Sequence, residues 1–185
     1  MYWGDYLPAR DNFDTITNTL VSAGGNVNVY NYREFGAYNT SAYESYLNLA
    51  STKKMLHVPE HAYYKDCNTD AYNALGEDFM KSIKTYMISI LKTIRVLLYN
   101  GQDDLIVNTP GAENWIANLD WYGRKEYLAA NKTIWHENNQ VVGYTRTYGN
   151  LRQVNVNKAG HMAPRDQPAN ILAMVNKFIE QEDFN

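Results

Sequence analysis

The chain has 185 residues, of which 45% are apolar and 20% are charged, and its net charge is -3. This composition predicts a globular protein with a core of its own and excludes a disordered chain. The negative charge and the lack of a basic stripe argue against nucleic-acid binding. No apolar run reaches the roughly 18 residues that a membrane span needs. We therefore expect neither nucleic acid nor a membrane among its partners.

The first half of the chain predicts mostly short elements. A weak helix is expected over residues 13–21 within an irregular segment, and a short alternating strand over 27–30. Residues 41–56 predict a pair of short helical turns. From Asp70 onward, apolar residues recur at every fourth position, which predicts one longer amphipathic helix. The apolar face would consist of Leu75, Phe79, Ile83, Met87 and Leu91.

The second half predicts the parts of a sheet. Residues 95–99 are a compact apolar run closed by Asn100 and Gly101, which is typical of a strand buried on both faces. A helix carrying Trp115, Ile116 and Leu119 is expected after Pro110.

A hairpin is expected next, with Asn138 and Asn139 in its turn, and it is followed by a strand over 151–157 that leads into the loop of His161. Pro168 opens a last helix, whose predicted inner face is Ile171, Leu172, Val175, Phe178 and Ile179.

This order of elements matches the closing segment of an open α/β sheet, where functional groups lie beyond the carboxyl ends of strands. Asp104 follows the apolar strand, and His161 stands in a loop bounded by glycine. A carboxylate bound to one imidazole nitrogen leaves the other free to accept the proton of a nucleophile. An aspartate after a strand is also a common turn or cap residue, so the spacing alone does not establish a catalytic pair.

The nucleophile of such a triad would precede the acid and the histidine in an α/β hydrolase. Ser22 comes nearest to a Gly-x-Ser-x-Gly elbow, but Leu20 stands where the first glycine should be. The other serines lie in predicted helices or in a glycosylation sequon. We therefore expect the nucleophile to lie outside this chain.

Two further features bear on the origin of the chain. The sequence holds two N-glycosylation sequons, at Asn39 and Asn131, and a single cysteine, Cys67, which has no partner within the chain. Residues 1–10 lack the basic and apolar regions of a signal peptide. The sequons, the cysteine and the missing signal together predict that this chain is the later part of a longer protein.

Several segments resemble the C-terminal region of serine carboxypeptidases. The most specific is the Gly-His-Met-x-Pro-x-Asp-Gln-Pro stretch over residues 160–168, and residues 98–108 and 143–151 also match. Residues 28–33 and 51–59 resemble the preceding segment in the vitellogenic-like branch. The resemblance covers nearly the whole chain.

The resemblance implies roles only where the motifs match. Asp104 is similar to the triad aspartate, whereas Asp103 is not, and His161 is similar to the triad histidine. Met162 resembles a methionine that walls the leaving-group side of the site, although simple loop packing explains it equally well. Cys67 resembles a disulfide cysteine whose partner would precede residue 1. No metal and no cofactor are implied.

The resemblance implies an α/β fold, namely the C-terminal portion of an α/β-hydrolase with part of its cap and an incomplete sheet. Residues 1–93 would be the cap-derived, helical segment, and 94–185 would carry the strands and helices that bear the acid and the base. The family's serine elbow and oxyanion donors are not in this chain, so we expect the chain alone to be nearly inert.

The implied activity of the complete protein is hydrolysis of the C-terminal peptide bond. The alternatives are a carboxypeptidase-like acyltransferase and a non-catalytic, hydrolase-derived fragment. The expected partners are a peptide substrate and the missing N-terminal part that carries the serine, and a homodimer of the complete protein stays open. The expected location is the secretory pathway, either lysosomal or extracellular.

Overall fold

The computed structural model describes residues 4–184, which divide into two compact units. The helical unit comprises residues 4–16 and 36–81, and the sheet unit comprises residues 17–35 and 82–184. Helix α1 (Tyr6–Ala23) contributes to both. It is longer than the weak helix expected over 13–21, and it ends at Gly24 and Gly25, where Gly25 takes a left-handed φ of 76° that favours glycine.

The helical unit holds short helices that bury little. Besides the start of α1 it contains α2 (Ser41–Leu47), α3 (Ala50–Met55), α4 (Thr69–Ala74) and α5 (Gly76–Phe79). The expected pair of helical turns over 41–56 is confirmed by α2 and α3. Within the described part of this unit, only Thr52 and Gly76 are buried.

The single long helix expected from Asp70 is wrong. The structure has α4, α5 and α6 (Lys84–Ile90) in its place. Gly76 lies so close to the Arg10 side chain that a Cβ there would collide with it. The predicted apolar stripe is also largely unburied, with Leu75 61% and Ile83 71% exposed. Because most helical stability comes from packing an apolar face, periodicity alone did not produce a continuous helix.

The sheet unit contains two sheets. Strands β1 (Val27–Asn28) and β2 (Asn31–Phe35) form a small antiparallel pair. The main sheet has the order β3-β6-β5-β4. Its strands are β3 (Val96–Gly101), β4 (Thr133–Glu137), β5 (Gln140–Tyr148) and β6 (Leu151–Val156).

Strand β3 runs parallel to β6, whereas β5 is antiparallel to both β6 and β4. The expected turn between β4 and β5 is confirmed, since Asn138 and Asn139 both have positive φ, at 50° and 61°. Strand β3 is only half-buried over residues 96–98, contrary to the expected burial on both faces. The reason is its position at one edge of the described sheet.

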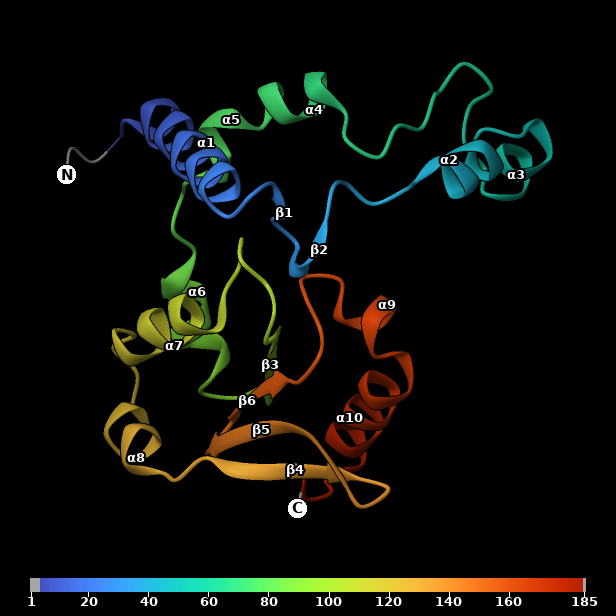
Figure 1. Cartoon of the computed structure of the whole chain (residues 1–185). Helices are drawn as coiled ribbons and strands as arrows, with labels where there is room; N and C mark the ends of the chain where they lie inside the picture. The colour runs from blue at the N-terminus through green and yellow to red at the C-terminus, as the bar shows by residue number, and fades with distance from the viewer. Residues whose placement is uncertain (1–3, 185) are drawn as a thin grey trace. The chain divides into compact units, whose positions relative to one another are not determined.

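Helices cover both faces of the main sheet (Figure 1). On one face lie α6, α7 (Thr109–Ala117) and α8 (Arg124–Ala129), and on the other lie α9 (Ala163–Asp166) and α10 (Pro168–Glu180). Pro110 stands in the first turn of α7, as expected. Helix α8 was not predicted.

Each face has a buried cluster of its own. Trp135, Val154, Val156 and Met174 lie at the centre of the cluster beneath α10, and Leu91, Ile116, Leu119 and Tyr127 belong to the other. The predicted inner face of α10 is partly wrong. Ile171 is buried, but Leu172 and Ile179 are exposed and Met174 takes the central place.

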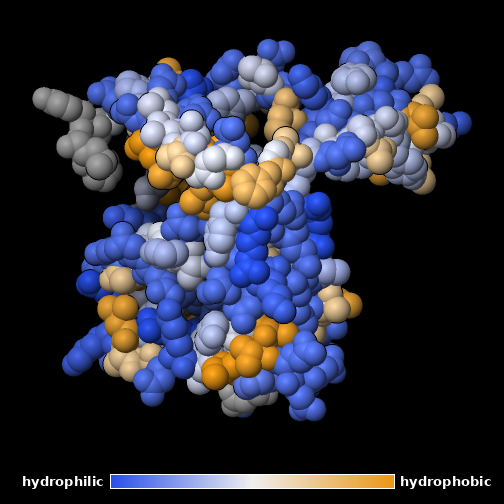
Figure 2. All heavy atoms as spheres, viewed as in Figure 1, coloured by the Kyte–Doolittle hydropathy of each residue, from blue (hydrophilic) through white to orange (hydrophobic). Residues whose placement is uncertain are grey.

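The face drawn in Figure 2 is mainly polar, with separate apolar patches. None of the helices in residues 4–184 has both the length and the apolar character needed to cross a bilayer. The structure is thus a mixed α/β protein with a short, four-stranded main sheet. The assignment of residues 1–93 to a cap-derived segment stays a prediction.

Candidate active site

Strand β3 delivers Asp104 to the carboxyl end of the main sheet. After Gly101 the chain remains tied to β6 and the loop that follows it, because Gln102 N–H donates to Val156 O at 2.9 Å and Asp103 N–H donates to Ala159 O at 2.8 Å. A Cβ on Gly101 would collide with the carbonyl oxygens of Ala159 and Gly160. A residue without a side chain is therefore needed where the two strand ends approach.

The histidine loop is equally constrained. Gly160 is buried, and a Cβ on it would collide with Tyr30 O. The Gly160 N–H donates to Asp166 Oδ2 at 2.8 Å, and the His161 N–H donates to Tyr30 O at 2.6 Å. The aspartate of the 160–168 motif thus holds the backbone that presents His161.

Asp104 and His161 meet in the geometry of an acid and a base. Asp104 Oδ2 lies 3.0 Å from His161 Nδ1, and Asp104 Oδ1 accepts a hydrogen bond from Val107 N–H at 3.0 Å. The Asp104 side chain is 3% exposed, and the His161 side chain is 37% exposed. A carboxylate accepts only, so Nδ1 carries the proton and Nε2 is left as the acceptor.

A strap formed by residues 27–35, which include β1 and β2, packs against this pair. The N–H groups of Leu105 and Ile106 both donate to Val29 O at 3.2 Å, and Tyr32 N–H donates to Asp103 O at 3.0 Å. The Tyr30 ring lies 5.4 Å from the imidazole of His161, measured between ring centroids. Segments far apart in the sequence therefore converge on the two candidate residues.

The other four predicted site residues are exposed, as their proposed roles require. Met162 follows His161 and its residue is 46% exposed. Cys67 is exposed and free in the helical unit. Asn39 and Asn131 are both exposed, and Asn39 Oδ1 accepts hydrogen bonds from the N–H and the hydroxyl of Ser41, its own sequon residue. The roles of these four residues stay predictions.

Sequence reasoning assigned no role to four residues that line this region: Tyr30, Asn31, Arg33 and Asp103. Among these four residues, only Asp103 has a feature that the sequence could have revealed. It is a second charged residue shortly after an apolar run, and a carboxylate in that position can be buried if it is paired. Its partner could not be found by pattern, because Arg33 lies on a distant segment that only the fold brings near.

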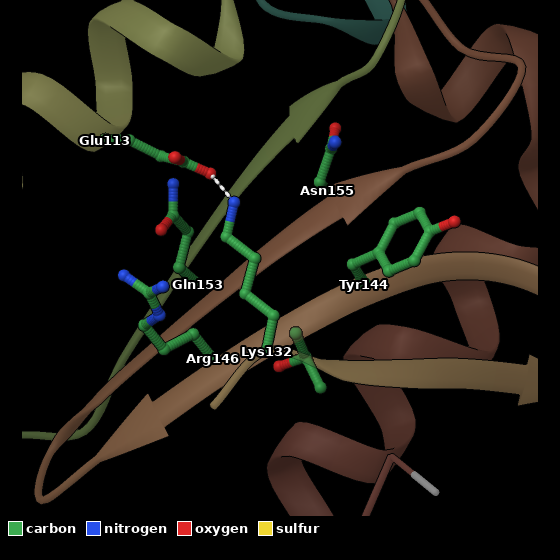
Figure 3. A pocket seen from close by; sticks show the side chains of 7 residues that line it. Glu113, Lys132, Tyr144, Arg146, Gln153 and Asn155 are labelled. Carbon is green, nitrogen blue, oxygen red and sulfur yellow. Dashed lines mark hydrogen bonds and ion pairs between the residues drawn. The ribbon is translucent and has the colours of Figure 1, made fainter. Parts of the chain in front are cut away.

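A polar hollow lies on the main sheet (Figure 3), and neither Asp104 nor His161 is among the residues that line it. Glu113 of α7 pairs with Lys132 across it, and Arg146, Gln153 and Asn155 point into it from β5 and β6. Its volume of about 50 Å³ is far below the roughly 300 Å³ of a typical ligand pocket. Burial raises the pKa of Tyr127, which hydrogen-bonds Gln153 at 2.6 Å, to about 12. At this volume the hollow is too small for a typical small-molecule ligand.

Within residues 4–184, no group of three or more His, Cys, Asp or Glu side chains could hold a metal ion. The chemistry that the described site supports is proton transfer by the imidazole of His161, oriented by Asp104.

Similar sequences occur in proteins that are named as serine carboxypeptidases. The family model described as serine carboxypeptidase matches residues 11–181. A Dictyostelium discoideum protein named as a serine carboxypeptidase family member is 34% identical over 184 residues, which is 96% of this chain and 44% of the relative. A second protein of that organism, named "Probable serine carboxypeptidase CPVL", is 39% identical over 145 residues, covering 77% of this chain and 29% of the relative.

Among solved structures, the prohormone-processing carboxypeptidase Kex1(delta)p of Saccharomyces cerevisiae matches with a TM-score of 0.71 at 23% identity. The match covers 84% of this chain and 36% of that one, and it shows the α/β-hydrolase fold expected from the sequence. The chain thus spans less than half the length of these proteins. On its sequence and its fold, the chain belongs to the serine carboxypeptidase family.

Proposed function

We propose that the complete protein is a serine-type carboxypeptidase and that this chain supplies the acid and the base of its triad. The observation that carries the proposal is the 3.0 Å contact between Asp104 Oδ2 and His161 Nδ1. Asp104 is buried and held from its second oxygen by Val107 N–H, so the carboxylate is fixed before any substrate arrives. The partly exposed imidazole remains accessible to a nucleophile.

The proposed reaction proceeds in two steps. His161 Nε2 takes the proton of the serine hydroxyl as that oxygen attacks the last peptide carbonyl, and Asp104 stabilises the imidazolium that results. The imidazolium then protonates the leaving amino group, which frees the C-terminal residue. A water molecule, deprotonated by the same nitrogen, releases the acyl group from the serine.

The serine itself is proposed to come from a segment outside residues 1–185, because no serine of this chain stands in a Gly-x-Ser-x-Gly motif. The edge position of β3 supports this arrangement, since a parallel strand from that segment can pair with its open side. The relatives named as serine carboxypeptidases, all longer than this chain, support it too. Met162 is proposed to wall the leaving-group side, next to His161.

A secretory or lysosomal location accompanies this proposal. The exposed sequons at Asn39 and Asn131 and the exposed thiol of Cys67 support it. One relative, 32% identical over 139 residues, is named "Venom serine carboxypeptidase" of Apis mellifera. Sugar on the two asparagines and a disulfide from Cys67 to an upstream cysteine are the modifications we propose.

The test is an assay of the product of the complete coding sequence with an N-blocked dipeptide, in which the released C-terminal amino acid is measured. The variant His161→Gln and the 185-residue chain alone serve as controls, and both should release none. Release that is lost in the variant supports the proposal. Transfer of the acyl group to an added alcohol or amine, without release into water, would identify an acyltransferase. No turnover of either kind would identify a non-catalytic protein.

A further inference from the structure

Asp103 is a buried carboxylate that the proposed mechanism does not use. Its side chain is 0% exposed, deeper than that of its neighbour Asp104 at 3%. Within residues 4–184, neither of its carboxylate oxygens has a hydrogen-bond partner, and its compensation is the ion pair with Arg33, whose Nε lies 3.0 Å from Asp103 Oδ2. A buried charge is costly unless it is paired, so this residue needs an explanation.

Arg33 belongs to β2, and its position in that strand is informative. Alternate residues of a strand point to the same side, which places the side chains of Asn31 and Arg33 on one side of β2. Asn31 Nδ2 donates to Asp166 Oδ2 at 3.2 Å, and that same oxygen accepts the Gly160 N–H at 2.8 Å. Arg33 reaches Asp103, the residue next to Asp104. One strand thus binds both segments that carry the candidate acid and base.

We propose that Arg33 and Asp103 are positioning residues: their ion pair clamps the strap of residues 27–35 across the Asp104 and His161 loops and so holds the two side chains in register. The proposal rests on the proposed function for its catalytic meaning, but the geometry that it describes can be measured without any activity.

The strap of residues 27–35 is bonded to the site at two ends. At the His161 end, the strap contributes the hydrogen bond from His161 N–H to Tyr30 O at 2.6 Å. At the Asp104 end, it contributes the bonds to Val29 O and from Tyr32 N–H to Asp103 O. These backbone contacts allow small shifts along the strand. The ion pair between Arg33 and the fully buried carboxylate of Asp103 resists such shifts, because separating the two would leave a buried charge without a partner. The ion pair therefore fixes the register of the other contacts.

The tautomer of His161 reports on this register. A neutral imidazole in water favours the proton on Nε2, whereas a carboxylate at Nδ1 holds it on Nδ1. We would label the histidines of the full chain with ¹⁵N and record long-range ¹H–¹⁵N correlations at about pH 8.5, where an ordinary imidazole is neutral. The loss of one of the four histidine patterns in His161→Gln assigns its signal.

Arg33→Met alone leaves the buried carboxylate of Asp103 without a partner. A loss of folding could then not be told apart from a loss of positioning. The decisive variant is therefore Arg33→Met combined with Asp103→Leu, which removes both charges and keeps an apolar side chain at the buried position. In this double variant the Nδ1–H tautomer should fall from the dominant form to a minority, with an unchanged far-UV circular dichroism spectrum. Arg33→Lys, which keeps the charge, should retain most of the Nδ1–H form.

The matched control is Lys132→Met combined with Glu113→Leu, another ion pair of the sheet unit with a partly exposed cation. This control should leave the tautomer of His161 unchanged. A double variant of Arg33 and Asp103 that folds and keeps the full Nδ1–H population would overturn the proposal, as would an equal loss in the control. If the tautomer shifts as expected but the complete protein shows no hydrolysis, the clamp stands and the proposed function fails.

Discussion

The helical unit and the sheet unit differ in how strongly their parts are bound to one another. In the described part of the helical unit only Thr52 and Gly76 are buried, and its packing depends on contacts such as the Phe13–Phe79 ring pair at 5.6 Å. The sheet unit has two buried clusters on opposite faces of its sheet. Asp104 and His161 both lie in the sheet unit.

A precise catalytic site needs the kind of packing found in the sheet unit. Catalytic side chains must be held within a fraction of an ångström, and a close-packed core with strand pairing provides that rigidity. Helices that expose most of their apolar residues depend on other surfaces for their stability. We therefore expect substitutions of one residue type to have large effects in the sheet unit and small effects in the helical unit.

The largest expected effect concerns catalysis by the complete protein. Asp104→Asn should lower kcat by about 10⁴-fold, because the amide no longer holds the correct tautomer of His161, as seen for the corresponding change in a well-studied protease. Asp78→Asn, at an exposed position of the helical unit, should leave kcat unchanged. Steady-state hydrolysis of the blocked dipeptide measures both. Equal losses in the two variants would contradict the assignment of Asp104.

A second comparison uses one residue type in the two units. Met174 is 0% exposed in the sheet unit, and Met55 is 62% exposed in the helical unit. Met174→Ala should lower the free energy of unfolding by about 2–5 kcal/mol, because it leaves a cavity in the core beneath α10. Met55→Ala should change it by less than about 0.5 kcal/mol. Urea titration gives both values, and similar values would mean that the two units are equally packed.

A third prediction concerns the glycine that precedes His161. Gly160→Ala should cost about 1–3 kcal/mol of stability, because the new methyl group collides with Tyr30 O and pushes the histidine loop away from the strap. A shift of about 1 Å should also lower the turnover of the complete protein by roughly 100-fold. Gly111→Ala, in the first turn of α7, is the control: its Cβ would lie 3.2 Å from Asn108 Oδ1, away from His161, and turnover should be unchanged. A Gly160→Ala variant with normal turnover would show that the loop does not need this close approach.

The smallest expected effect depends on pH. Burial raises the pKa of Glu137, but hydrogen bonds from Lys177 Nζ at 2.6 Å and Trp135 Nε1 lower it by more, so the net pKa lies below its ordinary value. A lowered pKa in the folded state stabilises the protein above the unfolded pKa of about 4.3, and this stabilisation is lost as the pH falls through the folded value. Glu137→Gln should therefore cost about 1 kcal/mol at neutral pH.

The measurement for Glu137 is urea unfolding of both proteins at pH 7 and near pH 3. The difference between the original chain and Glu137→Gln should shrink at the lower pH. Glu77→Gln, at an exposed position of the helical unit, should show no such change between the two pH values. A difference that stays constant with pH would mean that the Glu137 contribution is packing, not charge.

Local sequence predicted the elements with strong signals of their own. The turn of Asn138 and Asn139, the first turn of α7 at Pro110, and the apolar run of β3 all appear where they were expected. These features depend on backbone preferences and on side chains a few residues apart, which a pattern can capture. Predictions that depended on burial were weaker. The long helix from Asp70 and the exposed Leu172 show that periodicity does not decide which face is buried.

The family, the α/β class and the choice of Asp104 and His161 as candidate acid and base could all be predicted from the amino-acid sequence, because the 160–168 motif and the strand before Asp104 are local features. The contacts of Tyr30, Asn31 and Arg33 with this region, and the burial and pairing of Asp103, became visible only in the folded structure. Ion pairs and close backbone approaches act through space. Their partners lie on distant segments, and the sequence holds no local mark of which segments the folded chain brings together.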